Sequence, residues 1–268
     1  MSPVDHLHQF GRTPRGRDPR VPHLSALIAG KTLTPPPTSV NNVAGMNQSF
    51  GMMLNDNLGD CTCAAFYHAV QVWTFHASPA EVTEPDQDVE DLYEQACGYN
   101  PAVSGPGPGG NEQHVLQFLL NTGAPVGPSG QSRNKILAYV EVDNRNADDV
   151  KRTISDCGVA YIGFPVPANV TYNNRTWDYD PQAKMTRDGH AVVLVGYDSQ
   201  AATAISWGQL YTVTWAFVSK IVDEVYAIAD PTWIAKTGKT PGGLTVAELE
   251  TQMQALKEGS AAGRGAAA

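Results

Sequence analysis

A cysteine at the start of an apolar helix and a histidine at the start of an apolar strand are the residues whose types and positions could do chemistry. Cys61 follows a polar turn, residues 55–60, and precedes a segment in which apolar residues recur every three or four positions. A thiol there faces free backbone N–H groups and the positive end of the helix dipole, which favour the thiolate. The turn therefore predicts a nucleophile; a small buried residue that only begins the helix is the alternative.

A thiolate nucleophile needs a group that takes up and returns its proton, and the sequence has seven histidines. Three lie in the first 23 residues, and His114 is interpreted as structural. His68 is two turns from Cys61 on the same helix, too far for a hydrogen bond at about 1.5 Å of rise per residue. His190 opens an apolar run in the other half of the chain. We expect it at the mouth of a buried strand, facing Cys61 across a cleft; a histidine that only satisfies a strand edge is the alternative.

Metal binding is the other chemistry that a Cys-Thr-Cys sequence suggests. Residues two apart on a helix project roughly 200° apart, so Cys61 and Cys63 cannot both face one ion. We therefore expect no metal and no cofactor, and we interpret Cys63, Cys97 and Cys157 as core or surface thiols. Four cysteines in 268 residues are too few for a disulfide framework and indicate a reducing compartment.

The composition excludes several classes of protein. A chain of 268 residues, 42% hydrophobic and 17% charged, suffices for one large domain or two lobes. No apolar run approaches the roughly 18 residues of a membrane-spanning helix, so we expect neither an integral membrane protein nor a membrane partner. A net charge of -9 repels a phosphate backbone, so no nucleic-acid partner is expected. The first residues do not form a convincing export signal.

The sequence divides into an arm, a body and a tail. Residues 1–34 carry five Lys or Arg, two Asp and four Pro, so they predict either an extended arm across the acidic body or a mobile tail. Residues 35–258 form the body, which ends in a helix at about 244–256. Residues 259–268 are rich in Gly, Ala and Ser and are expected to be disordered.

The spacing of apolar residues changes from helical to strand-like along the body. Helices are predicted at residues 61–77, 88–97, 111–121 and 148–156. Strands are predicted at residues 159–166, 191–197, 203–207, 211–217 and 225–229. Helices first and strands later predict an α+β fold with a helical lobe at about 55–125 and a β-rich lobe at about 126–235.

The sequence resembles papain-like cysteine peptidases over roughly residues 35–230, because their motifs occur here in the same order. The family pattern of a glutamine, five residues and the nucleophilic cysteine is similar to Asn55 and Cys61, with Gly59 two residues before the cysteine. Further similar segments are residues 37–41, Gly109-Gly110, Gly189-His190-Ala191-Val192 and Ser206-Trp207-Gly208. The residues of these motifs resemble those of a divergent bacterial or phage member of the family.

The resemblance implies a papain-like two-lobe fold. A helical lobe would carry the cysteine at a helix N-terminus and pack against an antiparallel β-sheet or barrel lobe that carries the histidine. It also implies that Cys61 is the nucleophile, His190 the general base and acid, and Asn55 the amide that stabilises the oxyanion. Peptide or peptidoglycan-like material would be the substrate.

One residue departs from the family pattern. Ile205 stands where the family has an asparagine before Ser-Trp-Gly, and an isoleucine cannot hydrogen-bond the imidazole. Strand alternation predicts that Ser206 faces the other way, so Asp188 or Asp198 is the expected partner of the ring. Two functions follow: a cysteine-dependent peptidase or amidase that acts through a thioester at Cys61, or a non-catalytic papain-like structural or interaction protein.

The second function would make the protein a virion component or other assembly, with protein partners bound through the N-terminal arm. Leu58 stands where secreted members have a paired cysteine, so a location in the bacterial cytoplasm or in a virion is expected. Trp207 and Tyr226 are interpreted as sheet core, and the Asp223-Glu224 pair as either a solvated turn or part of the cleft.

Overall fold

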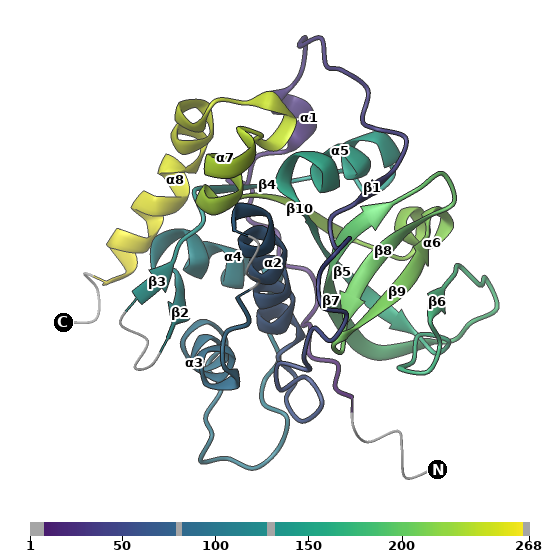
Figure 1. Ribbon diagram of the computed structural model, residues 1–268. Helices are drawn as coiled ribbons and strands as arrows, with labels where there is room; N and C mark the ends of the chain where they lie inside the picture. Colours follow the sequence, from purple (N-terminus) through teal and green to yellow (C-terminus); the bar gives the residue numbers. More distant parts are fainter. Residues whose placement is uncertain (1–7, 79–81, 128–131, 265–268) are drawn as a thin grey trace.

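A buried helix separates a helical side of the molecule from a β-sheet. The computed structural model describes residues 8–78, 82–127 and 132–264, with side chains described up to residue 257. Helix α2 (Cys61–Ala77) is buried along its first 13 residues. Figure 1 places α3 (Asp86–Cys97), α4 (Glu112–Asn121) and α8 (Val246–Arg264) on one side of α2 and most of the sheet on the other. Residues 1–7 of the arm and 265–268 of the tail lie outside the described part.

Among the described residues the main sheet has eight strands, and its long strand β7 (Met185–Tyr197) carries His190. The strand order is β4-β10-β5-β7-β8-β9-β6, and the two-residue strand β1 also pairs with β7. All these pairs are antiparallel except that of β6 with β9. The bounds are β1 Val40–Asn41, β4 Ala138–Glu141, β5 Ala160–Pro167, β6 Thr176–Trp177, β8 Ala201–Ser206, β9 Gln209–Thr214 and β10 Glu224–Ala229. Residues 191–197 of β7 are buried without alternation, because the strand is covered on both faces and α2 packs against one of them.

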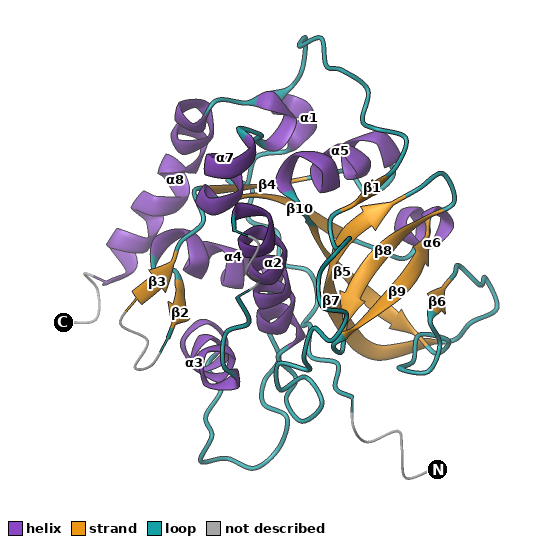
Figure 2. Ribbon diagram, viewed as in Figure 1, coloured by secondary structure: helices purple, strands orange, loops and turns teal. Residues whose placement is uncertain are grey.

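The predicted α+β class is confirmed, with Cys61 at the start of a helix and His190 in the sheet (Figure 2). The strand predicted at 211–217 is wrong at its end. Thr214 accepts a hydrogen bond from the backbone N–H of Phe217 and caps a short helix, α6 (Trp215–Lys220). The remaining elements are α1 (Leu24–Leu27), β2 (Ala124–Val126), β3 (Ser132–Asn134), α5 (Ala147–Cys157), α7 (Pro231–Thr237) and the 3-10 helix η1 (Pro241–Gly243).

Helix α8 runs to Arg264, beyond the predicted end at residue 256 and into the segment expected to be disordered. Thr245 and Glu248 form a capping box at its start, since each side chain accepts from the other residue's backbone N–H. Among the described helices, none has the length and apolarity needed to cross a lipid bilayer.

Residues 8–14, called the covering segment below, are extended and join the two sides of the molecule. Gln9 N–H donates to the Asn55 carbonyl (2.9 Å), next to the start of α2, and Arg12 N–H donates to the Gly189 carbonyl (3.0 Å) in β7. The carbonyl of Gly11 accepts from Gly110 N–H at 2.7 Å. Residues 8–14 of the arm therefore lie extended across the body. They pass directly over the site predicted from the sequence.

Candidate active site

Cys61 is the first residue of α2 and is 1% exposed. A tight turn delivers it: Met53 and Leu54 both have left-handed backbone angles (φ 51° and 65°), and the Leu54 carbonyl accepts from the N–H of Leu58 at 2.8 Å. Left-handed angles in two successive residues other than glycine store backbone strain of about 1 kcal/mol each, which the buried surroundings must hold. The turn therefore fixes where the thiol lies.

The backbone N–H groups of Ala191 in β7 and Gly11 in the covering segment lie close enough to the Cys61 sulfur to act to lower the pKa of the thiol. The first contact brings the predicted nucleophile against the residue that follows His190. The second puts the covering segment directly on the thiol, so close to the start of α2 that a Cβ on Gly11 would lie 1.8 Å from the Gly59 carbonyl oxygen.

The expectation that the helix start prepares a thiolate is wrong for this arrangement. Burial raises the pKa of the Cys61 thiol to about 12, although the two N–H groups act to lower it. Burial also raises the pKa of Asp60, whose carboxylate oxygens have no hydrogen-bond partner among the described residues. Removal of water from the charged form outweighs the helix dipole, so the covered thiol is neutral at pH 7.

His190 is 1% exposed and lies among aromatic rings. Trp207 stacks on the imidazole with ring centroids 4.5 Å apart, and Phe10 of the covering segment meets it edge-on at 5.3 Å. Burial lowers the pKa of His190 to about 3, so the ring is neutral. Its Nε2 lies 2.8 Å from Ser206 Oγ, while its Nδ1 has no hydrogen-bond partner in the described part of the chain.

The expectation that Ser206 faces away from the ring is wrong. Val193 of β7 pairs with Ile205 of β8, and the same register places Ser206 opposite Val192, on the face that also carries His190. Ile205 points into the core and is fully buried. Neither expected alternative holds the imidazole: Asp188 is exposed, and the Asp198 carboxylate accepts from the N–H groups of residues 200 and 201.

Trp207 does more than fill the sheet core. It has a left-handed backbone angle (φ 46°) in the turn after β8, and the next residue, Gly208, forms an antiparallel bridge with Gly51. A Cβ on Gly208 would lie 2.8 Å from the Gly51 carbonyl, so the two turns approach closely only because of the glycine. This bridge ties the indole above His190 to the turn that leads to Cys61.

Asn55 lies in the same turn as Cys61 and is 2% exposed. One hydrogen of its side-chain amide is donated to the Leu58 carbonyl at 3.0 Å, which holds the turn. The amide has a second hydrogen. The structure therefore brings Asn55, Cys61 and His190 to one region, with the Asn55 amide also near enough to Asp60 to act to lower the pKa of that carboxyl.

Three carboxylates that the sequence analysis left unassigned or undecided lie around Arg12 of the covering segment: Glu112, Asp223 and Glu224. The interpretation of Asp223-Glu224 as a solvated turn is wrong for Glu224, whose side chain is fully buried, and both carboxylates contact Arg12. Only the opposite charges of arm and body signalled this contact in the sequence.

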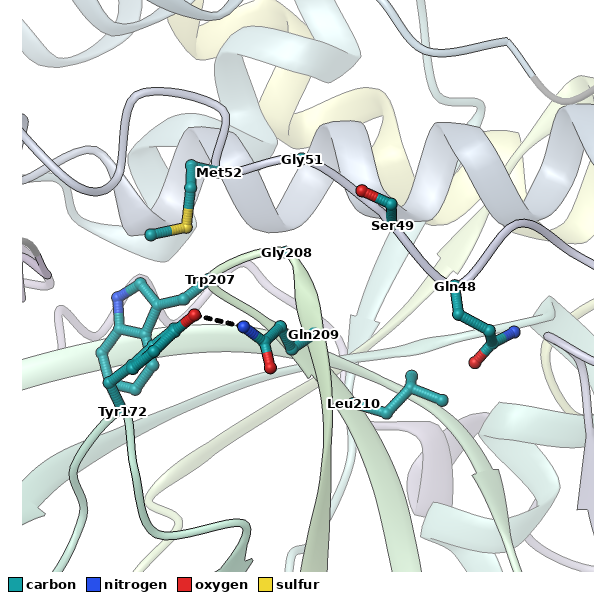
Figure 3. Close-up of a pocket in the computed structure, with 9 residues that line it drawn as sticks. All are labelled: Gln48, Ser49, Gly51, Met52, Tyr172, Trp207, Gly208, Gln209 and Leu210. Carbon is teal, nitrogen blue, oxygen red and sulfur yellow. Dashed lines mark hydrogen bonds between the residues drawn. The ribbon is translucent and has the colours of Figure 1, made fainter.

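A pocket of about 450 Å³ lies beside Trp207 (Figure 3). Tyr172 lines it, accepts a hydrogen bond from the Gln209 amide and stacks on His8 with centroids 3.6 Å apart. The other lining residues are Gln48, Ser49, Gly51, Met52, Gly208 and Leu210. The covering segment thus runs from this pocket at His8 to the carboxylates at Arg12.

The remaining cysteines do not contact the site predicted from the sequence. Cys157 is buried, and Cys63 and Cys97 are free thiols with sulfur atoms 4.0 Å apart. Hydrogen bonding from Cys63 lowers the pKa of Cys97, which is partly exposed. Among the described residues, no group of three or more His, Cys, Asp or Glu side chains could hold a metal ion.

No protein-family model and no curated protein matches the sequence, whereas solved structures match the fold. Xylellain, a cysteine protease from Xylella fastidiosa, is 16% identical with a TM-score of 0.63, over 86% of this chain and 99% of that one. Digestive procathepsin L2 from Tenebrio molitor larval midgut is 14% identical with a TM-score of 0.61, over 85% and 81%. The mite allergen structure of Blo t 1 and Der p 1 is 16% identical with a TM-score of 0.54, over 75% and 73%. The chain therefore has the fold of the papain-like cysteine proteases.

Proposed function

We propose that the protein is a cysteine-dependent peptidase or amidase in which Cys61 is the nucleophile and His190 the general base and acid. One observation carries the proposal: the backbone of Ala191, the residue next to His190, lies close enough to the Cys61 sulfur to act on the pKa of the thiol. A thiol at a helix start and an imidazole from the facing sheet form the pair that thiol acyl transfer needs. A fold shared with cysteine proteases supports the same chemistry by analogy.

Ser206 determines which imidazole nitrogen can take the proton. When Nε2–H donates to Ser206 Oγ, Nδ1 is left as the acceptor. Nδ1 removes the thiol proton as sulfur attacks the carbonyl carbon of an amide, and later gives that proton to the leaving amine. A thioester remains on Cys61, and water attacks it to release the acid and the free thiol. The Cys61 N–H and the second amide hydrogen of Asn55 would stabilise the oxyanion.

The covered arrangement is the latent form of this enzyme. The Gly11 N–H donates to the Gly189 carbonyl at 3.2 Å and lies beside the sulfur, so the segment places a backbone nitrogen next to Cys61 and not a carbonyl carbon that a thiolate can attack. Burial by the same segment keeps the thiol and the imidazole neutral. Departure of residues 8–14 would hydrate both groups and move both pKa values back toward their ordinary range.

The test compares the intact chain with a full-length Gly11→Val variant, whose side chain would overlap the Gly59 carbonyl and expel the segment. We expect Cys61 in the variant to be alkylated at pH 5 to 6, and the variant to hydrolyse denatured casein. Cys61→Ala should abolish hydrolysis without loss of folding. Cys157→Ala, which removes another buried thiol, should leave hydrolysis in place.

A Cys61 that titrates like a free thiol, near pH 8.5, with no hydrolysis in the Gly11→Val variant, would contradict the proposal. That result favours the non-catalytic alternative, in which the papain-like fold serves as a structural or interaction protein. The neutral, covered thiol is the observation that favours this second function.

A further inference from the structure

The guanidinium of Arg12 is held in a pocket that is built like a binding site. Its Nε donates to Glu112 Oε2 at 2.7 Å, and its Nη2 donates to Asp223 Oδ1 at 2.7 Å and to a Glu224 carboxylate oxygen. The Arg12 side chain is 3% exposed, and those of Glu112 and Glu224 are fully buried. Tyr226 donates its hydroxyl to the second oxygen of Glu224 at 2.6 Å and holds that carboxylate in place.

Three carboxyl groups share one guanidinium in this pocket. Burial, together with the charge of Glu224, raises the pKa of Glu112, and burial raises the pKa of Glu224. Oε1 of Glu112 has no hydrogen-bond partner among the described residues. Without a cation these buried carboxyl groups would have to take up protons, so a cationic occupant is what lets them stay ionised.

The backbone around the pocket leaves room for a guanidinium. Gly163 of β5 lies against the ion pair, and a Cβ there would lie 1.8 Å from Glu112 Oε2 and 2.3 Å from Arg12 Nε. The carboxylates of Glu112 and Glu224 come from the start of α4 and the start of β10, two elements that are not part of the covering segment. A planar cation with several donors matches carboxylates arriving from different directions better than the single ammonium of lysine does.

The position of Arg12 relates the pocket to the thiol. Gly11, its neighbour, faces the Cys61 sulfur, and the segment forms a parallel bridge with Gly110 at Arg12. The Arg12 N–H donates to Gly189, one residue before His190. Any peptide held by the same backbone groups would place one side chain in the carboxylate pocket and the adjacent residue on Cys61.

We propose that Glu112, Asp223 and Glu224 form a selectivity pocket for an arginine of a peptide bound across Cys61, and that Arg12 fills this pocket in the latent form. This inference rests on the proposed hydrolase function and names its substrate class: peptides with an arginine next to the residue that meets the thiol. Arg12 is then a ligand supplied by the chain itself, and an incoming arginine peptide competes with it.

A binding experiment tests the pocket without catalysis. The full-length chain would carry Gly11→Val and Arg12→Ala, which keep its own segment out, and Cys61→Ala, which prevents turnover. The probe is an acetylated peptide with the sequence of residues 9–14, compared by calorimetry with the same peptide carrying citrulline, a neutral isostere, in place of arginine. We expect the arginine peptide to bind at least about 30-fold more tightly than the citrulline peptide.

Two controls assign that preference to the pocket. Glu112→Gln with Glu224→Gln should reduce it to less than about threefold, and a chain with only Cys61→Ala, whose pocket Arg12 occupies, should bind the peptide at least about tenfold more weakly. Equal binding of the two peptides, or no binding to a chain whose melting curve shows that it is folded, would overturn the proposal. If the triple variant does not fold, Arg12→Ala with Cys61→Ala takes its place.

Restoring Cys61 separates the two hypotheses. If the opened enzyme cleaves arginine and citrulline peptides with equal kcat/KM, the hydrolase function stands and the arginine pocket falls. If the arginine peptide binds selectively but nothing is cleaved and Cys61 stays unreactive, the hydrolase function falls and the preference of the pocket for a guanidinium stands.

Discussion

His190 and Ser206 lie diagonally across two neighbouring strands, with Nε2 and Oγ 2.8 Å apart. The pairing of Val193 with Ile205 sets a register in which the side chains of His190 and Ser206 lie on one face of the sheet, beneath the indole of Trp207. A hydroxyl can accept the Nε2 hydrogen as an amide oxygen can, so the isoleucine at position 205 does not leave the ring without a partner. The imidazole therefore keeps a defined tautomer, with Nδ1 available as a proton acceptor.

Replacing Ser206 by alanine tests this relationship. We expect kcat/KM of the Gly11→Val enzyme to fall about 10- to 100-fold, because the ring loses the group that holds its orientation and tautomer. The melting temperature should change little, since only one hydroxyl is removed. Ser219→Ala, which also removes a single serine hydroxyl but from a half-buried position in α6, where the hydroxyl donates to the Ala216 carbonyl, is the matched control. Unchanged kinetics for Ser206→Ala would show that stacking on Trp207 alone orients the ring.

Arg12 should determine how often the cleft opens. Arg12→Ala removes the cation from a buried ion-pair network, a change that costs about 3 to 5 kcal/mol while the carboxylates stay buried. Opening hydrates Glu112 and Glu224, so the loss should appear as a higher open population rather than as global unfolding. We expect alkylation of Cys61 at pH 7.5 to accelerate at least about tenfold, followed by mass spectrometry.

Arg17 is the control for that experiment, because it is an arginine of the same arm but is exposed. Arg17→Ala should leave the alkylation rate of Cys61 unchanged. Equal acceleration by both substitutions would mean that the overall charge of the arm, and not the carboxylate pocket, holds the segment in place.

Local patterns predicted the elements that depend on local chemistry. Helix α2 begins and ends where its apolar spacing indicates, and Cys61 and His190 lie in motifs of adjacent residues. The strand predicted at 211–217 is wrong at its end because the aromatic residues there also fit a helix, and Thr214 caps α6 at that point. Propensity alone does not separate those two states.

The partners of the site residues depend on pairing between distant segments. The side that Ser206 faces follows from the register of β8 on β7, which shifts between Leu194 and Gly196. Arg12 meets Glu112 and Glu224 across separations of 100 and 212 residues. The raised pKa of Cys61 likewise follows from burial by a segment about 50 residues away, which no motif around Cys61 encodes.

Cys97, and not Cys61, should be the first thiol alkylated in the intact chain at pH 7. It is partly exposed and hydrogen bonding from Cys63 lowers its pKa, whereas Cys61 is covered and its pKa is raised. Reactivity follows the thiolate fraction and access, so we expect a difference of at least about tenfold in rate, measured by mapping modified peptides. Cys97→Ser should leave a chain that reacts slowly everywhere. Early modification of Cys61 in that variant would show that the covering segment leaves the cleft readily.

His190 and Cys61 together favour the closed form most between about pH 6.5 and pH 9. Burial lowers the pKa of His190 from 6.5 to about 3. Below pH 6.5 the open form therefore binds a proton that the closed form does not bind, so acid favours opening. Burial raises the pKa of Cys61 from 9.0 to about 12, so above pH 9 the open form releases a proton that the closed form keeps, and alkali also favours opening.

At pH 4.5 the His190 contribution amounts to about 2 to 3 kcal/mol against closure. Hydrogen exchange of residues 9–14, corrected for the intrinsic effect of pH, should report it as faster opening. Glu112, Asp223 and Glu224 act in the opposite direction, because their raised pKa values let the closed form bind protons as the pH falls. The difference between the intact chain and His190→Asn removes this shared contribution. An equal pH dependence in both chains would exclude His190 as the group that couples acid to opening.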